Sequence, residues 1–131
     1  MRKIGFIGCG HMAKALIKGL KSNKSYELFG HDRNSENLAW LGQEKIPFCS
    51  LKEICQESDI LMICVKPKDM YDLCSEMRTY IGNELKIVSV AAGITLENLK
   101  DALPRGKVYR AMPNIGAKHN LGVTSIFSYE E

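Results

Sequence analysis

The chain has 131 residues, of which 45% are hydrophobic and 25% are charged, and its formal net charge is +3. This length matches one globular domain, and this composition excludes a disordered or fibrous protein. The 18 basic and 15 acidic residues form no basic stripe, so we expect no nucleic-acid partner, and we expect no membrane span or signal peptide because no apolar run is long enough.

The first predicted element is an apolar strand over residues 4–7, which leads into a Gly-x-Gly-x-x-Ala turn and then into a helical pattern ending near Leu20. Gly8 allows a tight turn, Gly10 has no Cβ to hold the backbone away from phosphates, and Ala13 lets the helix lie close to the strand. Unpaired N–H groups at a helix N-terminus bind anions. The segment predicts a diphosphate cradle for a dinucleotide, made by Ile7, Gly8, Cys9, Gly10, His11 and Met12.

A second strand is predicted over residues 26–30, and polar residues follow it. Asp32 lies about 20 residues beyond the cradle, where a Rossmann domain places the acidic residue that contacts the adenosine ribose. Arg33 can stack on adenine or pair with a 2′-phosphate. Asp32 alone favours NAD, whereas Arg33 with Asn34 and Ser35 favours NADP, so the sequence leaves the cofactor open. Asp32 or Asn34 can also simply cap the helix that begins near Ser35.

Strands and helices continue to alternate along the chain. After a helix that carries Leu38 and Leu41, the predicted elements are an edge strand at 46–49, a helix at 51–57, a buried strand at 60–65, a helix at 69–80, a strand at 86–90, a turn at 91–93, a helix at 96–103, and strands at 107–111 and 122–127. This order predicts an α/β fold with a doubly wound, mostly parallel sheet of the Rossmann type, in one dinucleotide-binding domain over residues 1–131. Ligands bind such sheets at the carboxyl ends of the strands.

Four blocks in this order resemble the N-terminal domain of pyrroline-5-carboxylate reductase, and the resemblance covers essentially the whole chain. The blocks are residues 6–13, residues 64–67 (Cys-Val-Lys-Pro), residues 89–94 (Ser-Val-Ala-Ala-Gly-Ile) and residues 108–114 (Val-Tyr-Arg-Ala-Met-Pro-Asn). The resemblance implies NAD(P)H-dependent reduction of 1-pyrroline-5-carboxylate to L-proline, with NADP as the usual cofactor and NAD as the alternative. It also implies cofactor contacts from the loop after the second strand and from Val65, Lys66, Pro67, Ala91, Ala92 and Gly93, with Asn114 near the nicotinamide.

The chain departs from the family pattern at three places. Ile115 and Gly116 stand where the family commonly has Thr-Pro, and Leu51 stands where it often has a cofactor-contacting Asn. The family's C-terminal helical domain, which forms the dimer and much of the substrate pocket, is absent from the chain. We therefore expect a fragment or truncated product that is inactive alone and a homo-oligomer in the full-length protein. A related Rossmann oxidoreductase for a hydroxy acid or flavin-like acceptor, and a non-catalytic dinucleotide-binding module, remain as alternatives.

The remaining reactive residues indicate no other chemistry. The five cysteines are odd in number and show no Cys-x-x-Cys spacing, so we interpret them, including Cys9, as reduced packing residues of a cytoplasmic protein. No metal-ligand cluster or catalytic triad is present. His11 and His119 are predicted to be solvated or structural rather than general acids, and Lys66 is either a phosphate or ribose contact or an ordinary surface lysine. The sequence assigns no catalytic residue.

Overall fold

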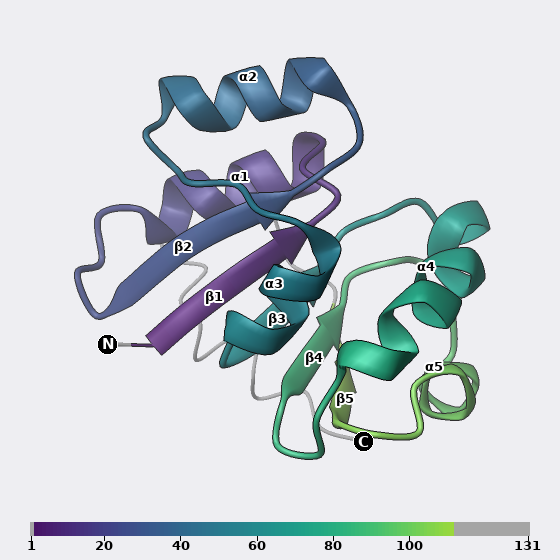
Figure 1. The fold of residues 1–131 in the computed structure, drawn as a ribbon. Helices are drawn as coiled ribbons and strands as arrows, with labels where there is room; N and C mark the ends of the chain where they lie inside the picture. Colours follow the sequence, from purple (N-terminus) through teal and green to yellow (C-terminus); the bar gives the residue numbers. More distant parts are fainter. Residues whose placement is uncertain (1, 112–131) are drawn as a thin grey trace.

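The computed structural model of the chain describes residues 2–111, which form one five-stranded sheet covered by helices (Figure 1). The strands are β1 (Arg2–Ile7), β2 (Tyr26–His31), β3 (Ile60–Ile63), β4 (Lys86–Ser89) and β5 (Lys107–Arg110). All neighbouring strands are parallel, in the order β2-β1-β3-β4-β5. The chain crosses over between β2 and β3, so the order reverses beside β1, and sheets of this kind bind ligands at the carboxyl edge of such a switch point.

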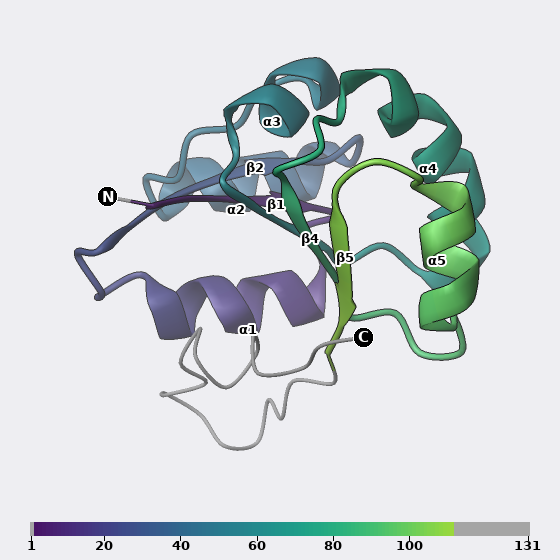
Figure 2. The same ribbon diagram turned by 90° about the horizontal axis from the view of Figure 1, so that it is seen from below.

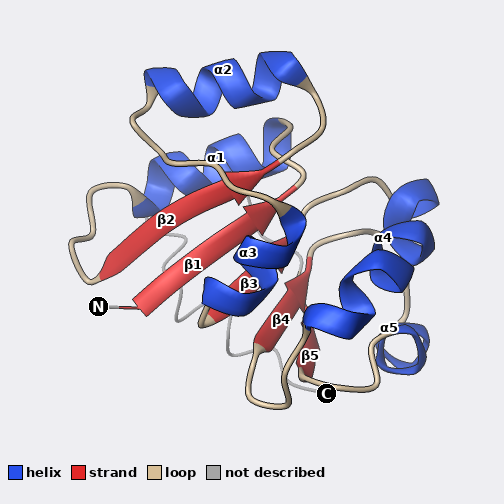
Figure 3. Cartoon of the chain, viewed as in Figure 1, coloured by secondary structure: helices blue, strands red, loops and turns tan. Residues whose placement is uncertain are grey.

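Helices cover both faces of the sheet, which confirms the doubly wound α/β prediction. They are α1 (His11–Leu20), α2 (Ser35–Gln43), α3 (Leu51–Glu57), α4 (Met70–Met77) and α5 (Leu96–Ala102), with short 3-10 turns η1 (Pro67–Asp69) and η2 (Arg78–Tyr80) at the two ends of α4. Helix α1 lies on one side of the sheet and α3, α4 and α5 lie on the other (Figure 2). Short loops join these helices to the strands (Figure 3). Within the part of the chain that the structure describes, no helix is long and apolar enough to cross a bilayer.

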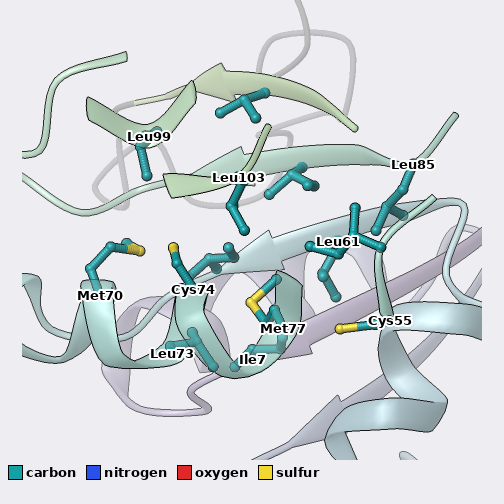
Figure 4. Packing of buried hydrophobic residues seen from close by; sticks show 14 of the residues in the cluster. Ile7, Cys55, Leu61, Met70, Leu73, Cys74, Met77, Leu85, Leu99 and Leu103 are labelled. Atoms are coloured by element: carbon teal, nitrogen blue, oxygen red, sulfur yellow. The ribbon is translucent and has the colours of Figure 1, made fainter. Parts of the chain in front are cut away.

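Strand β3 separates two hydrophobic clusters and is buried at every position, as its apolar sequence predicts. Ile60 and Met62 point into the cluster that contains α1 and α2, and Leu61 and Ile63 point into the cluster that contains α3, α4 and α5. Figure 4 shows this second cluster, in which Met70, Leu73, Cys74 and Met77 of α4 share the core with Leu61 of β3. Each buried side chain of this size stabilises the fold by about 1.5–3 kcal/mol. The two clusters hold the carboxyl ends of β1, β2 and β3 in fixed register.

The helix starts carry the residue types that favour capping. Asn34 accepts a hydrogen bond from the N–H of Asn37 at the start of α2, and Thr95 accepts one from the N–H of Asn98 at the start of α5. Helix α3 begins with a capping box in which the Ser50 hydroxyl accepts from the N–H of Glu53 and the Glu53 carboxylate accepts from the N–H of Ser50. These caps fix where each helix leaves the carboxyl edge of the sheet.

Besides small shifts at the ends of other elements, three predicted elements differ in the structure. The edge strand predicted at 46–49 is wrong, because only Phe48 pairs, in a single parallel bridge with Gly30, and the neighbouring Pro47 has no N–H to extend the ladder. Strand β3 ends at Ile63 instead of residue 65, since its partner β1 ends at Ile7. The helix predicted over 69–80 is α4 with a 3-10 turn at each end. The strand predicted at 122–127 lies outside the described residues.

Candidate functional site

The first glycine of the turn is required by the fold itself. Gly8 has φ +84°, a left-handed conformation that side chains with a Cβ rarely adopt. A Cβ added at Gly8 would lie 2.8 Å from Cγ1 and 3.0 Å from the backbone N of Val65, and 3.1 Å from the carbonyl carbon of Cys64. The N–H of Gly8 also donates to the carbonyl of His31 at 3.0 Å. The turn is therefore wedged between the end of β2 and the loop after β3.

The second glycine has no such internal reason. Gly10 has an ordinary φ of −81°, and a Cβ built on it would meet no atom of the described chain within 4 Å. It is also the N-cap of α1, where no side chain among residues 2–111 makes a capping hydrogen bond and no acidic residue lies in the first turn. Ala13 is fully buried, so α1 lies close against the sheet. Open space in front of an uncapped, positively polarised helix end is the geometry that binds a phosphate group.

The Asp32 carboxylate joins this turn to the start of α2. Its Oδ2 accepts hydrogen bonds from the N–H of Cys9 at 2.7 Å and from Nδ2 of Asn37 at 2.8 Å, and its Oδ1 accepts one from the N–H of Asn34 at 3.0 Å. Burial opposes the charged form, but these hydrogen bonds outweigh burial and lower the pKa of Asp32 below its ordinary value. These contacts use most of the acceptor capacity of the carboxylate.

A cleft of about 350 Å³ opens at the carboxyl ends of β1 and β2 and extends to α4. The structure brings five residues of the predicted site together around it: Ile7, Gly8, Asp32, Arg33 and Val65. Leu51, the first residue of α3, also lines the cleft, so the position where the resemblance places a polar Asn is apolar here. The space thus begins at the glycine turn and continues along the end of β2, as a bound adenosine diphosphate group would require.

The other predicted residues take positions around this edge without lining the cleft. Cys9 is buried inside the turn, His11 and Met12 begin α1, Asn34 caps α2, and Ser35 is the exposed first residue of α2. The capping interpretation of Asn34 is therefore confirmed. Lys66 is the exposed N-cap of η1 and exposed Pro67 is its first residue. The turn after β4 is formed by buried Ala91 and exposed Ala92 and Gly93, the last with φ +81°. Asn114 and His119 lie outside the described residues.

The wall of the cleft formed by η1 and α4 was not predicted. It carries Asp69, Asp72, Leu73 and Glu76. Nη2 of Arg33 donates to both carboxylate oxygens of Glu76, at 2.6 Å to Oε1 and 2.8 Å to Oε2. The acidic residues recur at positions i, i+3 and i+7, the spacing of one helix face. That spacing was a usable signal of a common face, but it does not say which other element the face meets.

The thiols near the site are inert at neutral pH. Burial, and then the negative charge of Asp32, raise the pKa of the Cys9 thiol to about 12, so the sulfur stays protonated and serves as packing. All five cysteines are free thiols. Among residues 2–111 no group of three His, Cys, Asp or Glu side chains could hold a metal ion.

Comparisons with known proteins agree with this geometry. Residues 3–93 match the model of the family described as NADP oxidoreductase, coenzyme F420-dependent. Pyrroline-5-carboxylate reductase of Escherichia coli strain K12 is 37% identical over 131 aligned residues, which cover 95% of this chain and 49% of the relative. The chain spans about half the length of the curated relatives it matches.

Solved structures give the same result. A 1-pyrroline-5-carboxylate reductase from Streptococcus pyogenes is 30% identical with a TM-score of 0.71, over 88% of this chain and 44% of that chain. A pyrroline carboxylate reductase from Plasmodium falciparum, solved with NADP bound, has a TM-score of 0.75 at 23% identity, over 87% of this chain and 43% of that chain. At this identity the Plasmodium match shows the fold alone. The resemblance that the four sequence blocks indicated is confirmed.

Proposed function

The chain belongs to the family described as NADP oxidoreductase, coenzyme F420-dependent, and from this membership we propose that it is the cofactor-binding domain of a pyrroline-5-carboxylate reductase. Gly10 carries the proposal. Its missing Cβ leaves space that the described chain does not fill, directly in front of the uncapped end of α1. A glycine that the fold does not need is explained by a ligand whose phosphates approach the backbone. NADP is the proposed cofactor, with NAD as the alternative.

The proposed contacts follow the order of the cleft. The turn from Ile7 to Met12 holds the diphosphate with backbone N–H groups, because Gly8 shapes the turn and Gly10 leaves room. The adenosine end lies beside Asp32, which fixes the turn, and Arg33, which offers a cation to a 2′-phosphate. The other proposed contact residues are Asn34, Ser35, Val65, Lys66 and Pro67 along the rim, and Ala91, Ala92, Gly93 and Asn114 toward the nicotinamide.

The chemistry of the proposed reaction belongs to the cofactor. When bound, a reduced nicotinamide supplies hydride to the C=N carbon of 1-pyrroline-5-carboxylate, and together with a proton on the imine nitrogen this gives proline. The residues of this chain bind and orient: Gly10 and the start of α1 locate the phosphates, and the small residues at 91–93 let a flat ring approach the backbone. No side chain of this chain is assigned as a proton donor.

The whole enzyme is proposed to need more than this domain. Since the curated relatives are about twice as long as the region they share with this chain, we propose that a helical domain of the kind the resemblance implies completes the substrate pocket and the interface of a homo-oligomer. The five free thiols support a reducing compartment, and we propose the cytoplasm.

Binding of NADPH to the 131-residue chain tests the cofactor site directly. We expect saturable enhancement of NADPH fluorescence by the wild-type chain and a large loss of affinity in Gly10→Val, which places a branched side chain in the space for phosphate. Gly19→Val is the matched control, because Gly19 lies on α1 with equally open surroundings but away from the turn.

Turnover tests the rest of the proposal. The product of the complete reading frame should release proline from NADPH and 1-pyrroline-5-carboxylate. NADPH oxidation with a 2-oxo acid, which would be reduced to the hydroxy acid, or with a deazaflavin acceptor, but not with the cyclic imine, would instead identify a related oxidoreductase.

A further inference from the structure

The charges around the cleft are strongly uneven. Of the eleven residues that line it, four are acidic, namely Asp32, Asp69, Asp72 and Glu76, while Arg33 is the one Lys or Arg side chain among these lining residues. Asp69 and Asp72 lie close enough to Arg33 to act on it electrostatically, after the larger effect of Glu76. A ligand that brings a further negative charge to this end of the cleft therefore depends on Arg33.

Arg33 is already engaged by a partner on the opposite wall. The residue follows β2, whereas Glu76 lies 43 positions later on α4, and both carboxylate oxygens lie within 2.8 Å of Nη2. The side chain of Arg33 is 78% exposed and that of Glu76 is 46% exposed. Ion pairs this exposed contribute little to folding because water and salt screen them. The pair can therefore open or be removed without loss of the fold.

We propose that Glu76 is a specificity-determining residue of the cofactor site, which competes with the 2′-phosphate of NADP for the Arg33 guanidinium and so weakens NADP relative to NAD. This inference rests on the proposed function. A phosphate monoester carries a charge of about −1.5 to −2 at neutral pH and pairs with a guanidinium in the same forked manner as a carboxylate. NAD has a hydroxyl at that position and brings no anion that competes with Glu76 for the Arg33 guanidinium, so Glu76 affects the two cofactors differently.

Glu76→Gln in the 131-residue chain is the central test. The substitution keeps the side-chain size and removes the charge, so we expect NADPH to bind about fivefold more tightly, whereas NADH affinity should change by less than about twofold. Glu84→Gln is the matched control, since Glu84 forms an exposed ion pair with Lys107 at 3.3 Å and does not line the cleft. It should leave both affinities unchanged.

A double-mutant cycle with Arg33→Gln identifies the route of the effect. If Glu76 acts by occupying Arg33, Glu76→Gln should raise the affinity for NADPH when Arg33 is present. In the Arg33→Gln background the same substitution should change the affinity for NADPH by less than about twofold. Equal tightening in both backgrounds would assign the effect to general charge repulsion and overturn the competition. Unchanged NADPH affinity in Glu76→Gln, with NADH and NADPH both still bound, would overturn the inference alone. Absence of binding by either nucleotide to the folded wild-type chain would overturn the proposed function and the inference together.

Discussion

Alanine in place of each glycine of the turn should separate folding from cofactor binding. At Gly8 the change forces an L residue into φ +84° and brings its Cβ to 2.8 Å from Cγ1 and 3.0 Å from the backbone N of Val65. The left-handed conformation costs about 1–2 kcal/mol, and overpacking costs about 1–3 kcal/mol. Gly8→Ala should therefore lower the free energy of unfolding by about 2–5 kcal/mol.

At Gly10 the same change should leave stability almost untouched. Its φ of −81° suits alanine, and no described atom lies within 4 Å of the new Cβ. Reduced entropy of the unfolded chain gains about 0.4–1 kcal/mol, while alanine is a poorer N-cap than glycine by about 0.5–1 kcal/mol, so the two effects nearly cancel. The methyl group would nevertheless displace phosphate from one or two N–H donors, which lowers the affinity for NADPH by about tenfold to a hundredfold.

Urea unfolding and NADPH fluorescence titration, performed on the same samples, measure the two effects. Gly19→Ala is the control, because it lies on α1 with open surroundings and should gain up to about 1 kcal/mol of stability with unchanged affinity. The reasoning is refuted if Gly10→Ala unfolds as easily as Gly8→Ala, or if it keeps full stability and binds NADPH as tightly as the wild type.

Two further substitutions test the supports of the site. Asp32→Asn should lower the free energy of unfolding by about 1–2 kcal/mol at neutral pH, because one amide cannot accept all three hydrogen bonds. The folded-state pKa of Asp32 lies below its ordinary value of 3.8, so this contribution is present above pH 3.8 and disappears as the pH falls through the folded-state pKa. Unfolding curves of the two proteins should then converge in acid, and a constant gap across that range would contradict the assignment. Ser50→Ala removes one half of the α3 capping box and should cost about 1 kcal/mol in urea unfolding, whereas Lys52→Ala on the exposed side of the same helix should cost less than about 0.5 kcal/mol. An equal loss in both variants would show that the cap is not the cause.

Local patterns in the sequence were sufficient for most of the fold. The unbroken apolar run at β3 predicted a strand buried on both faces, and the glycine turn predicted the start of α1, because each depends on neighbours close in sequence. The prediction of a strand around Pro47 was wrong because strand pairing depends on more than the local pattern. Apolar residues and a proline are compatible with an edge strand, but a ladder needs a partner, and only Phe48 reaches Gly30.

The acidic wall of the cleft could not be predicted from the sequence alone, because it depends on which elements meet in three dimensions. The sequence shows that Asp69, Asp72 and Glu76 share the spacing of one helix face, but it does not show that this face crosses to the end of β2. That approach depends on how Leu73 and Met77 of α4 pack into the core beside Ile7. Likewise, the sequence placed Asp32 directly after the second strand, but its hydrogen bonds with Cys9 and Asn37 depend on how closely the turn and α2 meet.

The three-way attachment of Asp32 has a consequence for anyone who wishes to redesign cofactor use. The usual first choice, exchanging the acidic residue after the second strand, would here also loosen the glycine turn that we propose as the diphosphate site, because the same carboxylate accepts hydrogen bonds from the N–H of Cys9 and from the side-chain amide of Asn37. Variant libraries that randomise position 32 should thus be dominated by clones with poor expression, whatever their nucleotide preference. Libraries that keep positions 32 and 37 constant and diversify Leu51 and Glu76 alter the lining of the cleft while its scaffold stays intact.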